Sequence, residues 1–389
     1  MSDNFFIEID SRQICAKGSI ISGNVCITKK HNGRTVVVLS DGGSSGIQTN
    51  VVASIIASMA INYSLAGEDP IRAAKAIIET FVRKDAKRAK FTIITICDSG
   101  NVTMVEFGNP EVVVVRDGEI FEISREKHNF KTETGIDLSI FYSDFFAQCE
   151  DRILSFTDGV TLSGYATFRM PQGFKIDGVR KMILATLAKT PHISGADLAL
   201  TIIASSEMND LFVVKNDMSC ASIYFRKPRR ILVCTGPPFN AEKDKELAEL
   251  VNNYDGDTII SGGTTSQIIA RELKRDISVI MKRDSSALPP ISKMEGVTMV
   301  TEGVLTLAKV KAMLESLKSS DIKENGIDAV YVKLLLQHDE INFIVGSRIN
   351  AVHQDPSLPI ELELRRNVIK EIGRLLETKF MKQINIKYI

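Results

Sequence analysis

Apolar and polar residues alternate in short runs over about the first 125 residues, a pattern typical of β-strands. The runs come in pairs, and each pair flanks a tight turn that contains Asn-Gly, Ser-Gly or Asp-Gly, residues that readily accept a positive φ. The predicted hairpins are Val25–Thr28 with Thr35–Leu39, Phe91–Cys97 with Val102–Phe107, and Val112–Val115 with Glu119–Ile123. Successive hairpins predict an antiparallel sheet.

Longer segments with helical spacing interrupt and follow these strands. The predicted helices are Thr49–Tyr63, Pro70–Lys84, Val179–Ala188 and Gly195–Ala204, and further strands are predicted at Ile153–Thr157, Leu211–Val214 and Ser219–Phe225. Because strands come in runs and helices in pairs, the pattern favours the α+β class over alternating βαβ units.

The chain of 389 residues is too long for one ordinary domain, and the basic, proline-containing segment 226–230 reads as a linker. Beyond it strands and helices alternate. The predicted strands are Ile231–Thr235, Thr258–Ser261, Ile277–Met281 and Val297–Thr301, and helices are predicted near Ala241–Asn252, Thr265–Lys274 and from about Leu305. We therefore predict one domain over residues 1–226 and a smaller, Rossmann-like α/β domain with a parallel sheet over residues 231–389.

Composition bears on which partners, metals and cellular location to expect. Lys and Arg number 48, as do Asp and Glu, so the net charge is zero and nothing in it favours nucleic acid or an anionic membrane. No apolar run approaches the roughly 18 residues of a membrane span, and the N-terminus lacks the basic start of a secretory signal. The six cysteines are scattered, which predicts reduced core thiols and no zinc site. We expect a cytoplasmic protein.

Two apolar segments end in Asp-Gly, at Asp41-Gly42 and at Asp158-Gly159. Each places a carboxylate at the end of a buried strand, and the following glycine lets the backbone approach closely enough to offer a carbonyl. Hard divalent cations take such oxygen ligands, so the two carboxylates are candidates for one metal centre. The alternative is that each Asp-Gly is a surface turn.

These segments carry a resemblance to a known family. Leu39–Gly46 followed by a helix, Ser155–Val160, and Asn216–Ser219 ahead of a strand resemble, in order, the signatures of PP2C-type serine/threonine phosphatases, in the bacterial branch typified by the stage II sporulation protein E phosphatase. The resemblance covers about residues 1–225. It implies an α/β/β/α sandwich, with helices on both faces of two packed sheets.

The resemblance also implies a metal centre with two Mn²⁺ or Mg²⁺ ions at one end of the sandwich. Asp41 would bridge both ions, the carbonyl of Gly42 would bind one and Asp158 the other. Paired cations lower the pKa of a bound water, which then attacks the phosphorus of a phosphoprotein substrate without a covalent intermediate.

The sequence departs from the family pattern at two expected ligands, where Asn24 and Asn216 stand in place of aspartate. Asparagine keeps a carbonyl oxygen but removes a negative charge, so metal affinity should fall. Asp217 is adjacent, yet alternation along a strand turns it away from the position of Asn216. Two hypotheses follow: a regulatory phosphatase with weakened metal binding, which we expect, or a pseudophosphatase that uses its fold for binding.

The helix predicted after Asp41 lies beside the expected metal centre. It either couples a partner, such as a second copy of the chain in a homodimer, to metal occupancy, or it is a structural amphipathic helix.

In the C-terminal domain, Gly262, Gly263, Thr264 and Thr265 lie between a predicted strand and a predicted helix. Free N–H groups at a helix start favour an anion, so a phosphate-containing ligand is one reading of this loop. The other is a helix cap made by Thr264 or Thr265.

Overall fold

The computed structural model describes residues 5–82, 90–279, 291–317, 326–347 and 358–389. They form two compact units, Met1–Lys227 and Pro228–Ile389. We describe each unit by itself.

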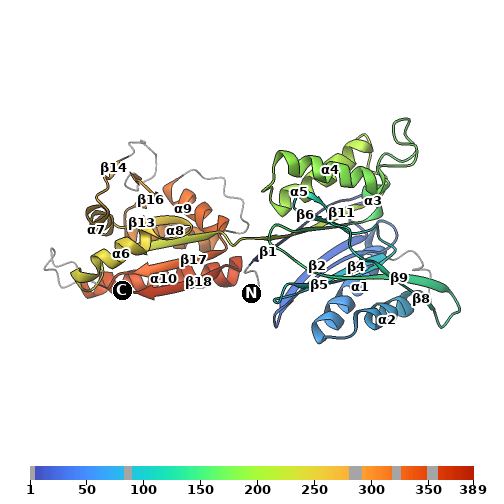
Figure 1. The fold of residues 1–389 in the computed structure, drawn as a ribbon, viewed down its shortest axis with the longest axis horizontal. Helices are drawn as coiled ribbons and strands as arrows, with labels where there is room; N and C mark the ends of the chain where they lie inside the picture. Colours follow the sequence, from blue (N-terminus) through green and yellow to red (C-terminus); the bar gives the residue numbers. More distant parts are fainter. Residues whose placement is uncertain (1–4, 83–89, 280–290, 318–325, 348–357) are drawn as a thin grey trace. The chain divides into compact units, whose positions relative to one another are not determined.

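The N-terminal unit contains two antiparallel sheets (Figure 1). The five-stranded sheet has the order β1 (Phe6–Ile14), β11 (Met218–Arg226), β10 (Arg152–Phe156), β6 (Val113–Arg116) and β7 (Glu119–Ile120). The six-stranded sheet has the order β2 (Asn24–His31), β3 (Arg34–Asp41), β4 (Lys90–Cys97), β5 (Asn101–Phe107), β9 (Asp137–Phe146) and β8 (Glu126–Lys131). The hairpins β2–β3, β4–β5 and β6–β7 confirm the predicted strand pairs.

Helices cover the outer faces of both sheets. They are α1 (Ile47–Ala66), α2 (Pro70–Val82), α3 (Asp158–Thr161), α4 (Lys175–Lys189) and α5 (Gly195–Asn209). One core packs α1 and α2 on the six-stranded sheet, a second packs α4 and α5 on the five-stranded sheet, and a third lies between the sheets. Figure 1 shows the resulting four layers, with α1 and α2 on one side and α4 and α5 on the other.

Helix α1 bears on the expectation that no apolar run approaches the length of a membrane span. Its 20 residues are long and apolar enough to cross a membrane by length and composition. In the structure, Ile56, Ala57 and Ala60 from this helix are buried in the core against the six-stranded sheet. The apolar character of α1 is therefore accounted for in part by packing.

The segment Leu211–Val214 was predicted to be a strand, and this prediction is wrong. The segment follows the end of α5 as a turn, in which Leu211 and Phe212 have φ values of 54° and 61°. These left-handed conformations are incompatible with an extended strand. Strand β11 forms without it and pairs with β1 and β10.

The C-terminal unit contains one seven-stranded sheet between helices. The strand order is β14 (Ser278–Val279), β15 (Ser292–Met294), β16 (Val297–Thr301), β13 (Asp257–Ser261), β12 (Arg230–Thr235), β17 (Glu340–Val345) and β18 (Gln383–Tyr388). The helices are η1 (Ala241–Lys243), α6 (Asp244–Asn252), α7 (Gly263–Leu273), α8 (Val304–Ser316), α9 (Ile327–Gln337) and α10 (Leu358–Phe380). Helices α6 and α7 pack on one face, and α8, α9 and α10 on the other.

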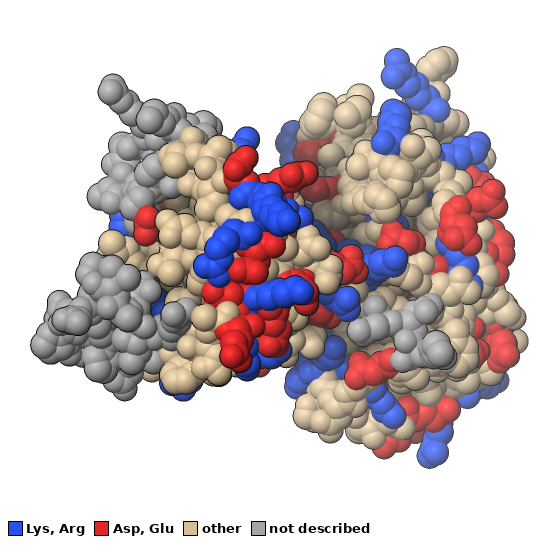
Figure 2. Space-filling view, turned by 60° about the vertical axis from the view of Figure 1, so that its left-hand side comes forward, with Lys and Arg blue, Asp and Glu red and all other residues tan. Residues whose placement is uncertain are grey.

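The sheet is mixed, which corrects the prediction of a parallel sheet. Strands β16, β13, β12, β17 and β18 are parallel, but β14 and β15 pair antiparallel at one edge. Part of the predicted strand Ile277–Met281 lies outside the described residues. On the face drawn in Figure 2, basic and acidic side chains are interspersed.

Candidate functional site

Asp41 and Asp158 come from different sheets and lie at one end of the sandwich. Asp41 is the last residue of β3, whereas Asp158 follows β10 and begins α3. Both carboxylates contact the same ammonium, that of Lys90. The structure thus brings together the two aspartates of the Asp-Gly motifs.

Lys90 is the residue of this site that the sequence analysis missed. It begins β4 directly opposite Asp41 in the antiparallel pair β3–β4. Its Nζ lies 3.7 Å from Asp41 Oδ2 and forms an ion pair and hydrogen bond with Asp158 Oδ2. Lys90 therefore ties the two sheets together at the position where the resemblance implies a cation.

Asp41 is largely buried, and this burial governs its electrostatics. The N–H of Gly43 donates to Asp41 Oδ1 at 2.7 Å. Burial raises the pKa of Asp41, the Gly43 N–H and the Lys90 ammonium lower it, and Asp158 and Asp217 raise it, with an upward net shift. The site has too little positive charge to offset the cost of burying this carboxylate.

Asn24 lies directly opposite Asp41 on the neighbouring strand β2 and is buried. Its Nδ2 donates to Thr157 Oγ1 at 3.2 Å and to Ser219 Oγ at 3.0 Å. The amide therefore links β2 to the other sheet through neutral hydrogen bonds. An aspartate there would lack the N–H donors that these bonds use.

Asn216 and Asp217 point to different surroundings. The Asn216 side chain is exposed. The buried Asp217 accepts hydrogen bonds from the N–H of Ala16 at 2.7 Å and from that of Gly23 at 2.6 Å, one on each carboxylate oxygen. Asp217 thus anchors the chain just before β2.

Gly42 lies where the chain leaves β3 and passes close to α1. Its N–H donates to the carbonyl of Gly23 at 3.0 Å. A Cβ added to Gly42 would lie 2.1 Å from the carbonyl oxygen of Thr49, so only glycine allows this approach.

These side chains do not fit a centre with two divalent ions. Each hard cation takes about six or more oxygen ligands and is held mainly by carboxylates. Among the residues that the structure describes, no three His, Cys, Asp or Glu side chains converge as a metal would require. An ammonium already lies against Asp41 and Asp158, the Asn24 amide donates to hydroxyls, and Asp217 is occupied by backbone N–H groups.

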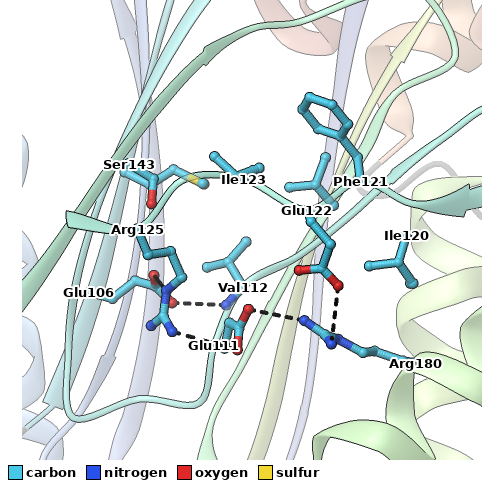
Figure 3. A pocket seen from close by; sticks show the side chains of 12 residues that line it. Glu106, Glu111, Val112, Ile120, Phe121, Glu122, Ile123, Arg125, Ser143 and Arg180 are labelled. Atoms are coloured by element: carbon cyan, nitrogen blue, oxygen red, sulfur yellow. Dashed lines mark hydrogen bonds and ion pairs between the residues drawn. The ribbon is translucent and has the colours of Figure 1, made fainter. Parts of the chain in front are cut away.

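A second polar cluster lies further along the sandwich and joins β5 to α4 (Figure 3). Arg125 contacts Glu106 at 3.0 Å and Glu111 at 3.5 Å, and Arg180 contacts Glu111 at 3.0 Å and Glu122 at 3.5 Å. The cavity beside them measures about 10 Å³, room for about one water. Its size and internal pairing indicate a structural network.

The loop that begins at Gly262, predicted to bind an anion, follows the carboxyl end of β13. The loop after Thr235 follows the carboxyl end of the parallel strand β12, at the same edge of the sheet. Helix α7 begins at Gly263, with Gly262 as its N-cap at a φ of 138°. The N-cap residue Gly262 has no side chain that could cap this first turn, and a cap made by Thr264 or Thr265 stays a prediction. Thr265 is buried. The phosphate-containing ligand remains a prediction.

Comparison with known proteins yields one family match. The model of the stage II sporulation protein E family matches residues 31–220, which lie within the N-terminal unit. No curated protein matches the chain.

Three solved structures are similar to part of this chain. One is the PP2C phosphatase domain with a fragment of the regulatory domain of SpoIIE from Bacillus subtilis, at 11% identity over 57% of this chain and 62% of that one, with a TM-score of 0.45. Another is the SiaA PP2C domain of Pseudomonas aeruginosa, at 11% identity over 56% of this chain and 85% of that one, with a TM-score of 0.43. The third is RsbX in complex with magnesium, at 15% identity over 58% of this chain and 98% of that one, with a TM-score of 0.37.

Proposed function

Because residues 31–220 belong to the stage II sporulation protein E family and form a PP2C-type phosphatase domain, we propose that this domain acts as a pseudophosphatase, a regulatory binding module that keeps the fold without efficient hydrolysis. The observation that carries the proposal is the ligand set. Of the expected ligand side chains, only those of Asp41 and Asp158 are acidic, while Asn24 and Asn216 are neutral.

The chemistry of the family explains why this matters. PP2C phosphatases typically use Mn²⁺ or Mg²⁺, which activates a water and neutralises phosphoryl oxygens. Divalent affinity follows the number of negative oxygen ligands, so each asparagine weakens the centre. The Lys90 ammonium further reduces the attraction that Asp41 and Asp158 exert on a cation.

Electrostatics also bears on what the module binds. A phosphoester entering this end of the sandwich meets the carboxylates of Asp41 and Asp158 against the single ammonium of Lys90. Like charges repel strongly where water is partly excluded. We therefore propose that a partner protein is recognised mainly through surfaces other than the one around Asp41, Asp158 and Lys90.

Hydrolysis of a generic phosphate ester, with Mn²⁺ varied over several decades of concentration, tests this proposal. The wild-type protein should show no more hydrolysis than the Asp158→Asn variant at any Mn²⁺ concentration. Mn²⁺-dependent hydrolysis that disappears in Asp158→Asn would contradict the proposal.

A contradiction of that kind would favour the second candidate, a metal-dependent phosphatase that removes phosphate from Ser or Thr of a regulatory partner protein. One observation supports it. Asp41 and Asp158 come from separate sheets and already lie within reach of one cation. This candidate requires the Lys90 ammonium to leave before a metal enters.

A further inference from the structure

We infer that Lys90 is a built-in cation of this site, and that its ammonium excludes divalent ions which the same carboxylates would otherwise bind. The inference rests on the proposed function, since it explains how the domain dispenses with a metal. It assigns a role to a residue that none of the Asp-Gly motifs contains.

The contacts of Lys90 are those of a bridging cation. Its Nζ contacts Asp41 on one sheet and Asp158 at the start of α3, just after β10 of the other sheet. The Lys90 side chain is 23% exposed, and that of Asp41 is 9% exposed. An ammonium in such a partly buried position is far less screened than one on the surface.

The fold holds Lys90 in this place from several directions. Its backbone is fixed by the β3–β4 register, which sets it directly across from Asp41. Gly108, at a φ of 73°, packs on its aliphatic stem so closely that an added Cβ would lie 2.6 Å from Lys90 Cγ. Asn109, the residue after Gly108, holds this segment in place. Its Nδ2 donates to the Leu39 carbonyl at 3.2 Å and to Thr92 Oγ1 at 3.1 Å. The aliphatic part of the Lys90 side chain is therefore held by its neighbours in the position that brings Nζ to the two carboxylates.

Charge explains why the ammonium and a metal exclude each other. Two carboxylates attract a divalent ion, but the Lys90 ammonium neutralises one charge of the pair and repels any second cation. Without it, Asp41 and Asp158 repel each other, and binding a divalent ion relieves that repulsion. Neutralising Lys90 should therefore convert the site into one that binds metal.

The test compares Mn²⁺ binding by the full-length wild type and by the Lys90→Met variant, using calorimetry and the thermal midpoint. Methionine keeps an unbranched stem beside Gly108 while removing the charge. We expect Lys90→Met to bind Mn²⁺ at least about tenfold more tightly than the wild type. Mn²⁺ should raise the thermal midpoint of Lys90→Met and leave that of the wild type unchanged.

Matched variants separate this effect from a general change in charge. Lys29→Met removes an exposed lysine from β2 and should bind Mn²⁺ like the wild type. Adding Asp158→Asn to Lys90→Met should abolish the gain. If Lys90→Met does not fold, Lys90→Gln should show the same gain, whereas Lys90→Arg should bind like the wild type.

The inference is overturned if neither neutral variant binds Mn²⁺ more tightly than the wild type, or if Lys29→Met gains as much. Its failure is distinct from that of the proposed function. The proposed function fails on Mn²⁺-dependent hydrolysis by the wild type, whereas the inference fails on the Mn²⁺ affinity of the variants.

Discussion

Asn216 and Asp217 are neighbours in sequence but have different roles. The family pattern expects a metal ligand at the first, whereas in the structure the second accepts buried hydrogen bonds. The pattern places a metal ligand at Asn216, whose side chain is exposed. The buried acid is Asp217, and both of its oxygens accept backbone N–H groups from Ala16 and Gly23. The carboxylate at this point of the chain thus serves the stability of the segment before β2.

Asp217→Ala should therefore lower the free energy of unfolding by about 2–4 kcal/mol, because two N–H groups lose a charged acceptor. Urea unfolding at neutral pH measures this change. Asn216→Ala is the matched control and should alter the free energy by less than about 0.5 kcal/mol. Equal effects of the two substitutions would contradict the roles assigned here.

Glu106 shows how burial and a cation compete at a single residue. It is 2% exposed, and burial raises its pKa, while Arg125 and the Val112 N–H lower it, with an upward net shift from 4.5. An acid whose pKa is raised by folding contributes stability below its unfolded pKa. That contribution is lost as the pH rises through the folded value.

Arg125→Met should raise the pKa of Glu106 further, so the variant should lose stability more steeply than the wild type as the pH rises above about 4.5. We expect the loss to reach about 1–2 kcal/mol near neutral pH and to be smaller near pH 5. Urea unfolding at several pH values measures it. Arg125→Lys retains a cation, so its stability loss relative to the wild type should depend less on pH. A loss in Arg125→Met that does not change with pH would contradict this prediction.

At the scale of helices and strands, local signals predicted much of the N-terminal unit. Asn-Gly, Ser-Gly and Asp-Gly turns identified the hairpins β2–β3, β4–β5 and β6–β7, since such turns act through backbone conformations of adjacent residues. The prediction of a strand at Leu211–Val214 was wrong, again because of the backbone conformation of a turn. Its β-branched and aromatic residues favour a strand, but the turn after α5 imposes positive φ at Leu211 and Phe212.

The candidate site was only partly predictable for a different reason. Asp41 and Asp158 carry a motif, whereas Lys90 looks like any lysine at a strand start. Its role arises from the β3–β4 register and from the packing of Gly108 on its stem, which join residues distant in the chain. In the C-terminal unit, the short edge strands β14 and β15 gave too brief a pattern to reveal their antiparallel pairing.

The junction between β3 and α1 depends on the absence of a side chain at Gly42. Gly42→Ala should lower the free energy of unfolding by about 1–3 kcal/mol, because the new Cβ would meet the backbone of Thr49 at 2.1 Å. Chemical denaturation measures it. In Gly195→Ala the added Cβ lies 3.4 Å from its nearest neighbour, so this control should change stability by less than about 1 kcal/mol. A neutral Gly42→Ala would mean that the α1 backbone yields easily.

The whole molecule consists of two units joined by a short, tied connection. Strand β11 ends at Arg226, where Nε donates to Glu8 Oε2 at 2.6 Å. Strand β12 begins at Arg230, and the N–H of Arg229 donates to Asp339 Oδ2 at 2.8 Å. Each end of the connection is therefore held by hydrogen bonds within its own unit, and only residues 227–229 lie between the two strands.

Each hydrophobic core is built from residues of a single unit, so we expect the units to unfold as separate cooperative transitions. Leu198 in α5 and Leu335 in α9 offer a matched pair, since both are fully buried leucines on helices. Leu198→Ala should lower the midpoint of one calorimetric transition, and Leu335→Ala that of the other, each by a loss of about 2–5 kcal/mol in its own unit. If either substitution shifts both transitions by similar amounts, the two units unfold together and this expectation is wrong.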